Sequence, residues 1–412
     1  DGTRRESLRL AMPDGTRLAT DVYLPRDGGT VPAVLIRLPY HRKHYGEARR
    51  WIEAFAPRGY AVVVQDMRGR WGSEGTFAPW PHAGPDGAAT LDWIAAQDWS
   101  DGQVATLGCS ALGESQAVLA TSDHPAHAAM VPIGAGGAIG TLGGAFGFFG
   151  MYEGGVPALA IASGWFARLG GKTAERMGVG PLPDLAHLPL RGVVAAIRDD
   201  PTDFEAHLDG LTDPAFWRAA GYIAEGAATG VPALWLDGWF DPNVHNTLRL
   251  AAGLGGPARV VIGPGQHCEL GETFAAGQVG DLPVSGPDPR LVETIAAFLD
   301  HRLRGGPAPD LPPYRVWMMR ADRWLDAQSW PPAAAVSRRL ALEGDALVPA
   351  EAATGAAPRA ILSDPADPVP SVGGPICCTG ALDIAPGPRD QRPIEGRADL
   401  LVYTSAPLET PL

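Results

Sequence analysis

The chain has 412 residues, 45% of them hydrophobic, and a formal net charge of −13 at pH 7. This length predicts two or three domains, each large enough for its own core, and the apolar runs are too short for a membrane span. The negative charge disfavours nucleic acid and anionic membrane surfaces as partners. We therefore expect a soluble globular protein that acts on a small molecule. The sequence leaves the oligomeric state of the protein open, with a homodimer as one alternative.

The first part of the chain alternates apolar segments with helical patterns. Strand-like residues 6–11 and 16–23 flank a turn at Pro13-Asp14-Gly15 and predict an antiparallel hairpin. Further buried strands are expected at 34–37, 60–65, 104–107 and 128–133, and helices at 47–57, at 84–97 and after Ser110. This alternation predicts a parallel sheet covered on both faces. Residues 1–135 are thus the expected first part of an α/β core.

The texture changes at Gly134, where a glycine-rich and aromatic stretch begins. Residues 136–224 carry helical patterns and are predicted as a helical cap inserted in the core. The core is expected to resume over 225–304, with strands at 233–236 and 259–262 and helices at 243–253 and 288–303. After the Gly- and Pro-rich linker 305–313, residues 314–412 have the short β-prone pieces of a β-sandwich, at 314–319, 337–342 and 400–403.

Ser110 lies between a β-prone run and helix-forming residues, with Gly108 and Gly113 on either side. A serine on such a strand-to-helix turn is exposed, and the first N–H groups of the helix can stabilise a developing oxyanion. The second glycine comes one residue later than in the common Gly-x-Ser-x-Gly pattern. The stretch is therefore interpreted as a nucleophile elbow, with an ordinary glycine-rich loop as the alternative.

A serine nucleophile requires a base and an acid, which in doubly wound hydrolases follow it in the order serine, acid, histidine. His267 directly follows a late predicted strand and is the expected base, unless it is a surface-loop histidine. The acid is expected after the intervening strand, where the pattern does not separate Asp237 from Asp241, which could instead cap a helix.

The loop after the strand at 34–37 is where a second oxyanion donor is expected. Tyr40 in this loop has a phenolic hydroxyl that can donate to an oxyanion, or could simply pack on the sheet edge. His41 and His44 lack a nearby cluster of acids, so we expect no metal and no cofactor.

The four cysteines do not have metal-ligand spacing. They are Cys109, Cys268, Cys377 and Cys378. The simplest interpretation is reduced thiols in a cytoplasmic protein, with Cys109 and Cys268 as small buried side chains next to the nucleophile and base.

A series of motifs resembles the cocaine esterase-like (CocE/NonD) α/β-hydrolases, which are related to X-Pro dipeptidyl-peptidases and α-amino acid ester hydrolases. The motifs follow one another along nearly the whole chain. They are Met12–Tyr23, Arg37–Tyr40, Gly59–Arg70, Gly72–Gly75, Asp92–Gln97, the elbow, Gly143–Phe146, Gly238–Asp241, Gly263–His267 and Asp390–Pro393.

This resemblance implies an α/β-hydrolase fold with a helical cap and a C-terminal jelly roll. It assigns Ser110 as nucleophile, Asp241 as the acid, His267 as the base, and the Tyr40 hydroxyl with the Ala111 backbone N–H as the oxyanion hole. The family usually has tyrosine after the serine, so Ala111 implies a wider pocket. Its jelly roll usually extends past the equivalent of the last residue here, so this domain is expected to be incomplete.

The expected reaction is hydrolysis of a carboxylic ester through an acyl-serine intermediate. Aromatic side chains of the cap and core favour an apolar or aromatic acyl or alcohol group; the candidates are Phe146, Phe149, Tyr152, Trp165, Phe166 and Trp239. An ammonium-bearing substrate would instead require a carboxylate, for which Glu153, Asp199, Asp200 and Asp203 are candidates. The alternatives are an amidase or X-Pro-type peptidase, an acyltransferase or lactone-forming enzyme, and a non-catalytic binding protein.

Overall fold

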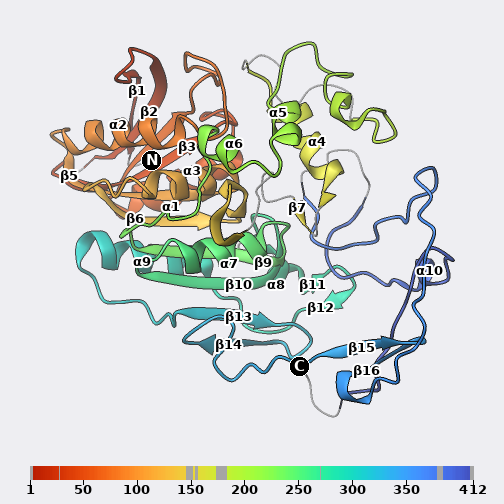
Figure 1. The fold of residues 1–412 in the computed structure, drawn as a ribbon. Helices are drawn as coiled ribbons and strands as arrows, with labels where there is room; N and C mark the ends of the chain where they lie inside the picture. The colour runs from red at the N-terminus through yellow and green to blue at the C-terminus, as the bar shows by residue number, and fades with distance from the viewer. Residues whose placement is uncertain are drawn as a thin grey trace.

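The computed structural model describes residues 3–26, 28–144, 152–153, 156–172, 183–269, 271–377 and 384–408. Its centre is a ten-stranded sheet with the order β1-β2-β4-β3-β5-β6-β9-β10-β13-β14 (Figure 1). The inner strands, from β4 to β13, run parallel, and β1, β2 and β14 are antiparallel to their neighbours. The predicted parallel sheet and opening hairpin are confirmed.

The strand bounds follow the apolar runs of the sequence, with most strands longer than expected. They are β1 (Thr3–Ala11), β2 (Arg17–Pro25), β3 (Val31–Leu38), β4 (Ala61–Asp66), β5 (Ser100–Cys109), β6 (His127–Ile133), β9 (Ala233–Phe240), β10 (Ala258–Gln266), β13 (Tyr314–Met318) and β14 (Arg323–Ala327).

Helices cover both faces of the sheet. They are α1 (Gly46–Phe55) and α9 (Leu291–Arg304) on one face, and α2 (Ala83–Ala95), α3 (Ala111–Ala120) and α7 (Val244–Gly253) on the other. Side chains of a strand point alternately to opposite faces. In β3, Val34 and Ile36 accordingly pack in the core under α1 and α9, whereas Leu35 packs in the core under α2. Two apolar layers therefore hold the sheet between the helices.

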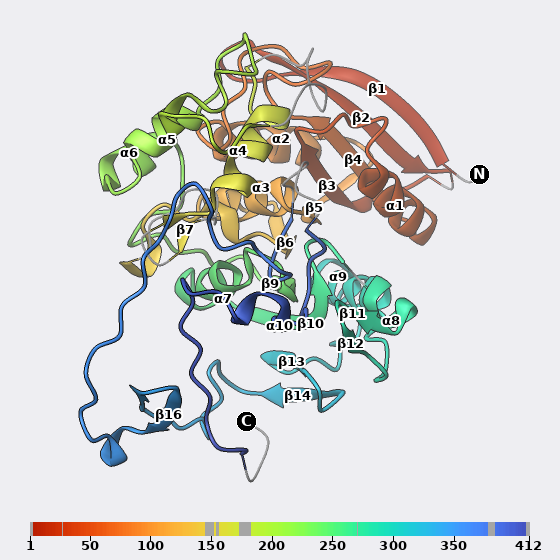
Figure 2. The same ribbon diagram turned by 90° about the vertical axis from the view of Figure 1, so that its right-hand side faces the viewer.

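The predicted cap contains the helices α4 (Leu159–Leu169), α5 (Phe204–Asp209) and α6 (Pro214–Ala219). Both views place these helices together, beside the β1–β6 half of the sheet (Figures 1 and 2). A short antiparallel ladder, β7 (Tyr152–Glu153) with β8 (Val156–Pro157), also occurs in this region. Helices thus occur in the described part of residues 136–224, and the helical cap as a domain stays a prediction.

The strand at 314–318 was expected in the C-terminal β-sandwich, and this placement is wrong. It pairs in parallel with β10 and so belongs to the main sheet. Val316 and Trp317, both fully buried, explain why, since the large sheet offers them an apolar environment that a separate small domain would have to build anew. The core therefore extends to the end of β14, beyond the predicted boundary at residue 304.

The remaining C-terminal residues contain a hairpin of β15 (Leu340–Glu343) and β16 (Ala346–Pro349) and the short helix α10 (Arg392–Glu395). The predicted strand at 400–403 is wrong, since the structure places only a single bridge nearby, between Ala346 and Thr404. The jelly roll stays a prediction. The other short elements are α8 (Glu272–Ala276), β11 (Gln278–Val279), β12 (Leu282–Pro283) and the 3₁₀ helices 56–58, 136–138, 142–144, 190–192 and 350–352.

Length and hydropathy of the helices bear on membrane insertion. Within the described ranges, no helix combines the length and the apolar character that crossing a bilayer requires.

Candidate active site

Ser110 occupies the turn between β5 and α3, at the carboxyl edge of the sheet. Its backbone has φ 59° and ψ −131°, a conformation that non-glycine residues rarely adopt. The Ser110 N–H donates to the carbonyl of Ile133 on the neighbouring strand β6 at 2.8 Å, which fixes this turn. A strained serine held between a strand and a helix is the geometry of a nucleophile elbow.

The late glycine of the elbow, Gly113, has a steric reason. A Cβ at this position would lie 2.8 Å from the Cβ of Ala135 and 2.9 Å from the carbonyl oxygen of Gly108. Helix α3 therefore packs so closely on the strand ends that only glycine fits one turn into the helix. The later glycine moves the close contact between helix α3 and the strand ends by one residue along the helix, and the elbow keeps its shape.

His267 follows β10 directly, as expected, and its Nδ1 lies 2.6 Å from Oδ2 of Asp241. The Asp241 side chain is completely buried, and its other oxygen accepts from the backbone N–H of Asn243 at 2.7 Å. Of the two carboxylates left open by the pattern, Asp241 is thus the one that contacts the imidazole. An acid in this position fixes the tautomer and the orientation of the ring.

Asp237 lies within β9, four residues before Asp241, and has different partners. Its carboxyl accepts from the hydroxyl of Thr247 at 2.6 Å and from the N–H of Gly238 at 2.8 Å. Burial, and then the neighbouring Asp241, raise the pKa of Asp237 well above its ordinary value. Burial acts most strongly on Asp241 and raises its pKa, but the attraction and hydrogen bond of His267 and the hydrogen bonds with Asp237 and the Asn243 N–H together lower it below its ordinary value. The negative charge of the pair therefore resides on Asp241.

Gly134, at the end of β6, is a site residue that the sequence did not reveal. It has φ +54°, and a Cβ here would lie 2.6 Å from Oδ2 of Asp241 and 3.2 Å from Nδ1 of His267. Any side chain would therefore intrude between the acid and the base. Its only signal was its place at the start of the glycine-rich stretch, which we interpreted as the beginning of the cap.

A cavity of about 400 Å³ opens over Ser110 and His267. Its lining comprises Tyr40, Tyr45, Trp71, Ser110, Gly164, Trp165, Arg168, Leu169, His267 and Cys268. Tyr40 comes from the loop after β3, as expected, and its hydroxyl oxygen lies 3.5 Å from the indole nitrogen of Trp165 on α4. Loop, elbow and cap thus meet around one space beside the candidate nucleophile.

Of the aromatic residues proposed to bind substrate, Trp165 lines this cavity. Phe166 instead packs in the cap core against Phe204 and His207, and Tyr152 packs against the same apolar cluster. Trp239 donates its indole N–H to the carbonyl of Trp317 at 2.7 Å and is not among the lining residues. These three residues are therefore structural by their contacts. Phe146 and Phe149 lie outside the described residues.

Glu47 on α1 is hydrogen-bonded to the backbone of the elbow. Its Oε1 accepts from the backbone N–H of Cys109 at 2.7 Å and from the indole N–H of Trp51 at 3.0 Å. Burial raises the pKa of this carboxyl. The residue before the candidate nucleophile is thus held by a side chain that the sequence marked only as helical.

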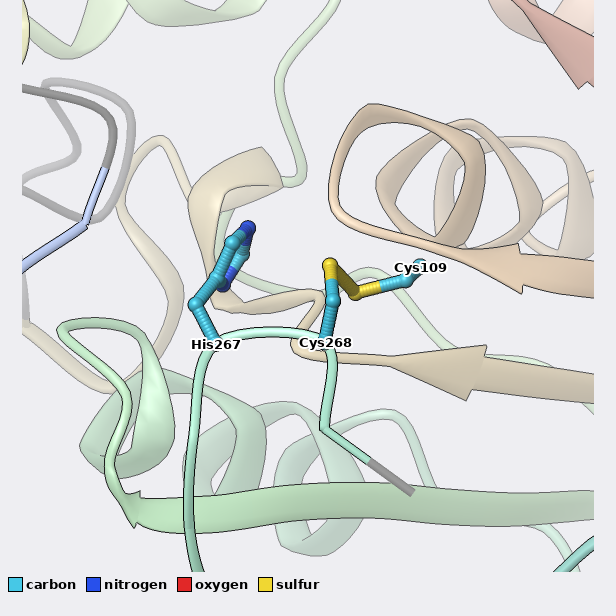
Figure 3. A group of neighbouring side chains, drawn as sticks. All are labelled: Cys109, His267 and Cys268. Carbon is cyan, nitrogen blue, oxygen red and sulfur yellow. A yellow bond between two sulfur atoms is a disulfide. The ribbon is translucent and has the colours of Figure 1, made fainter. Parts of the chain in front are cut away.

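Cys109 and Cys268 form a disulfide, so the expectation of reduced thiols is wrong for this pair (Figure 3). Cys109 precedes Ser110 and Cys268 follows His267, and the elbow and the histidine loop are therefore covalently joined. A nitrogen of His267 and both sulfurs lie within 4.8 Å of one another, but sulfurs joined to each other offer no thiolate to a metal. The argument for a cytoplasmic location, which depended on reduced cysteines, loses its basis.

We expect loss of this disulfide to destabilise the fold. The bond closes a loop over a sequence separation of 159 residues, and its removal by Cys109→Ser with Cys268→Ser should lower the free energy of unfolding by about 2–5 kcal/mol. Urea unfolding measures this, with Ser337→Ala as the control because Ser337 is exposed and lies far from both cysteines in the sequence. Dithiothreitol should lower the midpoint of the wild type and leave that of the double variant in place. Equal midpoints for all three proteins would contradict the prediction.

Comparison with known proteins agrees with this geometry. The family model of X-Pro dipeptidyl-peptidases (S15 family) matches residues 14–269. The cocaine esterase of Rhodococcus sp. is 31% identical over 98% of this chain and 75% of its own length. Among solved structures, an aminopeptidase from a marine sediment archaeon, Thaumarchaeota archaeon (TM-score 0.77, 23% identity), covers 99% of this chain and 73% of its own.

An α-amino acid ester hydrolase is also similar in structure, with a TM-score of 0.71 at 24% identity, and it covers 99% of this chain and 73% of its own. These two structures show the same fold. The family model matches most of the core, and the cocaine esterase is similar over almost the whole chain. These two findings show the family as well as the fold. The chain belongs to the cocaine esterase-like α/β-hydrolases of the S15 family and is a serine hydrolase of carboxylic esters.

Proposed function

We propose that Ser110 is the nucleophile, His267 its general base and Asp241 the acid that orients the imidazole. The observation that carries this proposal is the 2.6 Å contact between Asp241 and a histidine that lines the same cavity as Ser110. Nε2 of His267 takes the hydroxyl proton as Ser110 attacks the ester carbonyl, and the same proton then passes to the leaving alcohol. Water hydrolyses the acyl-serine by the same steps.

The oxyanion of the tetrahedral intermediate is proposed to lie between the Tyr40 hydroxyl and the Ala111 N–H. Ala111 is the first residue of α3, and the first N–H groups of a helix have no acceptor within the helix. The positive end of the helix dipole also favours negative charge at this point. Tyr40 lines the cavity from the opposite loop, which supports a second donor there.

The substrate is proposed to place an apolar or aromatic group in the cavity. Four aromatic side chains and one leucine line it: Tyr40, Tyr45, Trp71, Trp165 and Leu169. Such a surface gains free energy when it is covered by an apolar acyl or alcohol group. The small Ala111 side chain leaves room beside the nucleophile.

The test is active-site labelling followed by kinetics on matched substrates. A fluorophosphonate should modify Ser110, which peptide mass spectrometry locates, and labelling should abolish the hydrolysis of phenyl acetate. The corresponding anilide should react far more slowly, which separates an esterase from an amidase. Capture of the acyl group by added alcohols in preference to water would indicate an acyltransferase. No labelling of Ser110 would refute the proposed roles.

A further inference from the structure

Arg168 is the permanently charged residue in the lining of the cavity that also contains Ser110 and His267. It lies in the last turn of α4, and it shares one face of that helix with Gly164, Trp165 and Leu169, which also line the cavity. Arg168 is half-buried, and within the described residues its guanidinium forms neither an ion pair nor a hydrogen bond. Arg168 is therefore available to bind an anionic group that enters the cavity.

Two of the acidic residues that the sequence offered for an ammonium group already form ion pairs. Asp200 pairs with Arg198 at 2.8 Å, and Asp203 pairs with Lys172 at 2.6 Å. Neither carboxylate lines the cavity, so neither offers a site for the ammonium group considered from the sequence. The described lining thus presents a positive charge and aromatic surface to a substrate.

We propose that Arg168 selects esters whose acyl or alcohol part carries a carboxylate at its far end. This inference rests on the proposed function of Ser110 and names the substrate class of the same site. A guanidinium binds a carboxylate through two parallel N–H···O hydrogen bonds, and the pair is stronger where aromatic side chains exclude water. The aromatic lining would contact the apolar part of the ester, and Arg168 would fix its charged end.

Two pairs of substrates, matched in size, test this proposal. Monophenyl adipate and its neutral amide, phenyl adipamate, place the carboxylate on the acyl side, whereas 3-acetoxybenzoate and 3-acetoxybenzamide place it on the alcohol side. The measured quantity is the ratio of kcat/KM for the charged member to that for the neutral member. In the wild type we expect this ratio to be about 10 to 100 in at least one pair, as a charge-assisted hydrogen bond provides.

Arg168→Met should bring this ratio close to one, mainly through a higher KM for the charged ester. Arg168→Glu should bring it below one and favour 3-(aminomethyl)phenyl acetate instead. Arg218→Met is the control, because it removes an exposed arginine of the cap that is not among the cavity-lining residues, and it should keep the wild-type ratio. The rate of fluorophosphonate labelling reports whether each variant keeps its fold and its nucleophile.

A wild-type ratio near one in both pairs would overturn the assignment of Arg168 and leave the esterase function standing. The same conclusion follows if Arg168→Met keeps the wild-type preference. Failure of the proposed function has a different signature, namely no labelling of Ser110 and no hydrolysis of either member of either pair.

Discussion

Replacing Ser110 by alanine should lower kcat for a carboxylic ester by roughly 10⁴- to 10⁶-fold. The hydroxyl is the atom that forms the acyl-enzyme, and neither His267 nor the oxyanion hole can supply a covalent intermediate in its place. Alanine keeps the Cβ and removes only the hydroxyl, so the backbone of the elbow and the fold should be unaffected. Initial rates on phenyl acetate measure the loss, and circular dichroism verifies folding.

A matched control for this variant is Ser122→Ala, which changes an exposed serine just beyond the end of α3. It should keep full turnover and full labelling by a fluorophosphonate. Turnover by Ser110→Ala within tenfold of the wild type would exclude an acyl-serine mechanism at this site. The cavity would then have to work through another nucleophile or as a binding site.

Asp241→Asn should lower kcat by about 10⁴-fold, with little change in KM. The carboxylate accepts a hydrogen bond from Nδ1 of His267 at 2.6 Å, which leaves Nε2 free to take the serine proton. An amide can instead donate to Nδ1 and stabilise the wrong tautomer. It also cannot stabilise the imidazolium that forms during acyl transfer.

Asp237→Asn is the informative comparison, because both carboxyls are buried at the end of β9. Burial raises the pKa of Asp237 and so favours its neutral form, which a neutral amide resembles in charge. Asp237 is hydrogen-bonded with Thr247, with the Gly238 N–H and with Asp241. Within the described residues it forms no hydrogen bond with His267, so weakening one of these bonds should lower kcat by no more than about tenfold. A larger loss of kcat in Asp237→Asn than in Asp241→Asn would show that Asp237, and not Asp241, is the acid.

The strands of the main sheet from β3 to β10 and their parallel pairing could be predicted because each is a largely apolar run and most of them are followed by a helical pattern. The strand β13 is different. Its pattern predicts a strand correctly, but nothing in five residues says which sheet the strand joins, since hydrogen-bonding edges are equivalent until the rest of the chain is folded. The Gly- and Pro-rich linker before it suggested a domain boundary that the packing of Val316 and Trp317 does not respect.

Some residues of the candidate site could likewise be predicted from the sequence, and others could not. Ser110, His267 and Tyr40 could be placed because each follows a predicted strand, and the carboxyl ends of parallel strands share one edge of the sheet. The choice of Asp241 over Asp237 needed the family resemblance, since both follow the same strand by a few residues. In the structure, the contact of Asp241 with His267 distinguishes the two.

The disulfide and Gly134 could not be predicted for a physical reason. A disulfide requires two Cβ atoms within a few ångströms, and the sequence places Cys109 and Cys268 far apart. Gly134 is required by the space between two side chains that come from other strands. Both depend on distances between separate segments, which short motifs do not encode.

The disulfide also gives Ser110 and His267 a second covalent connection, besides the peptide backbone of the cap. The segment from α4 to α6 lies wholly between Cys109 and Cys268 in the chain, so the two cysteines bracket it. A protease that cut one bond in that segment would leave both fragments attached through sulfur, with Ser110 on one and His267 on the other. The two parts of the hydrolytic centre would therefore stay in one covalently linked molecule after such a cut.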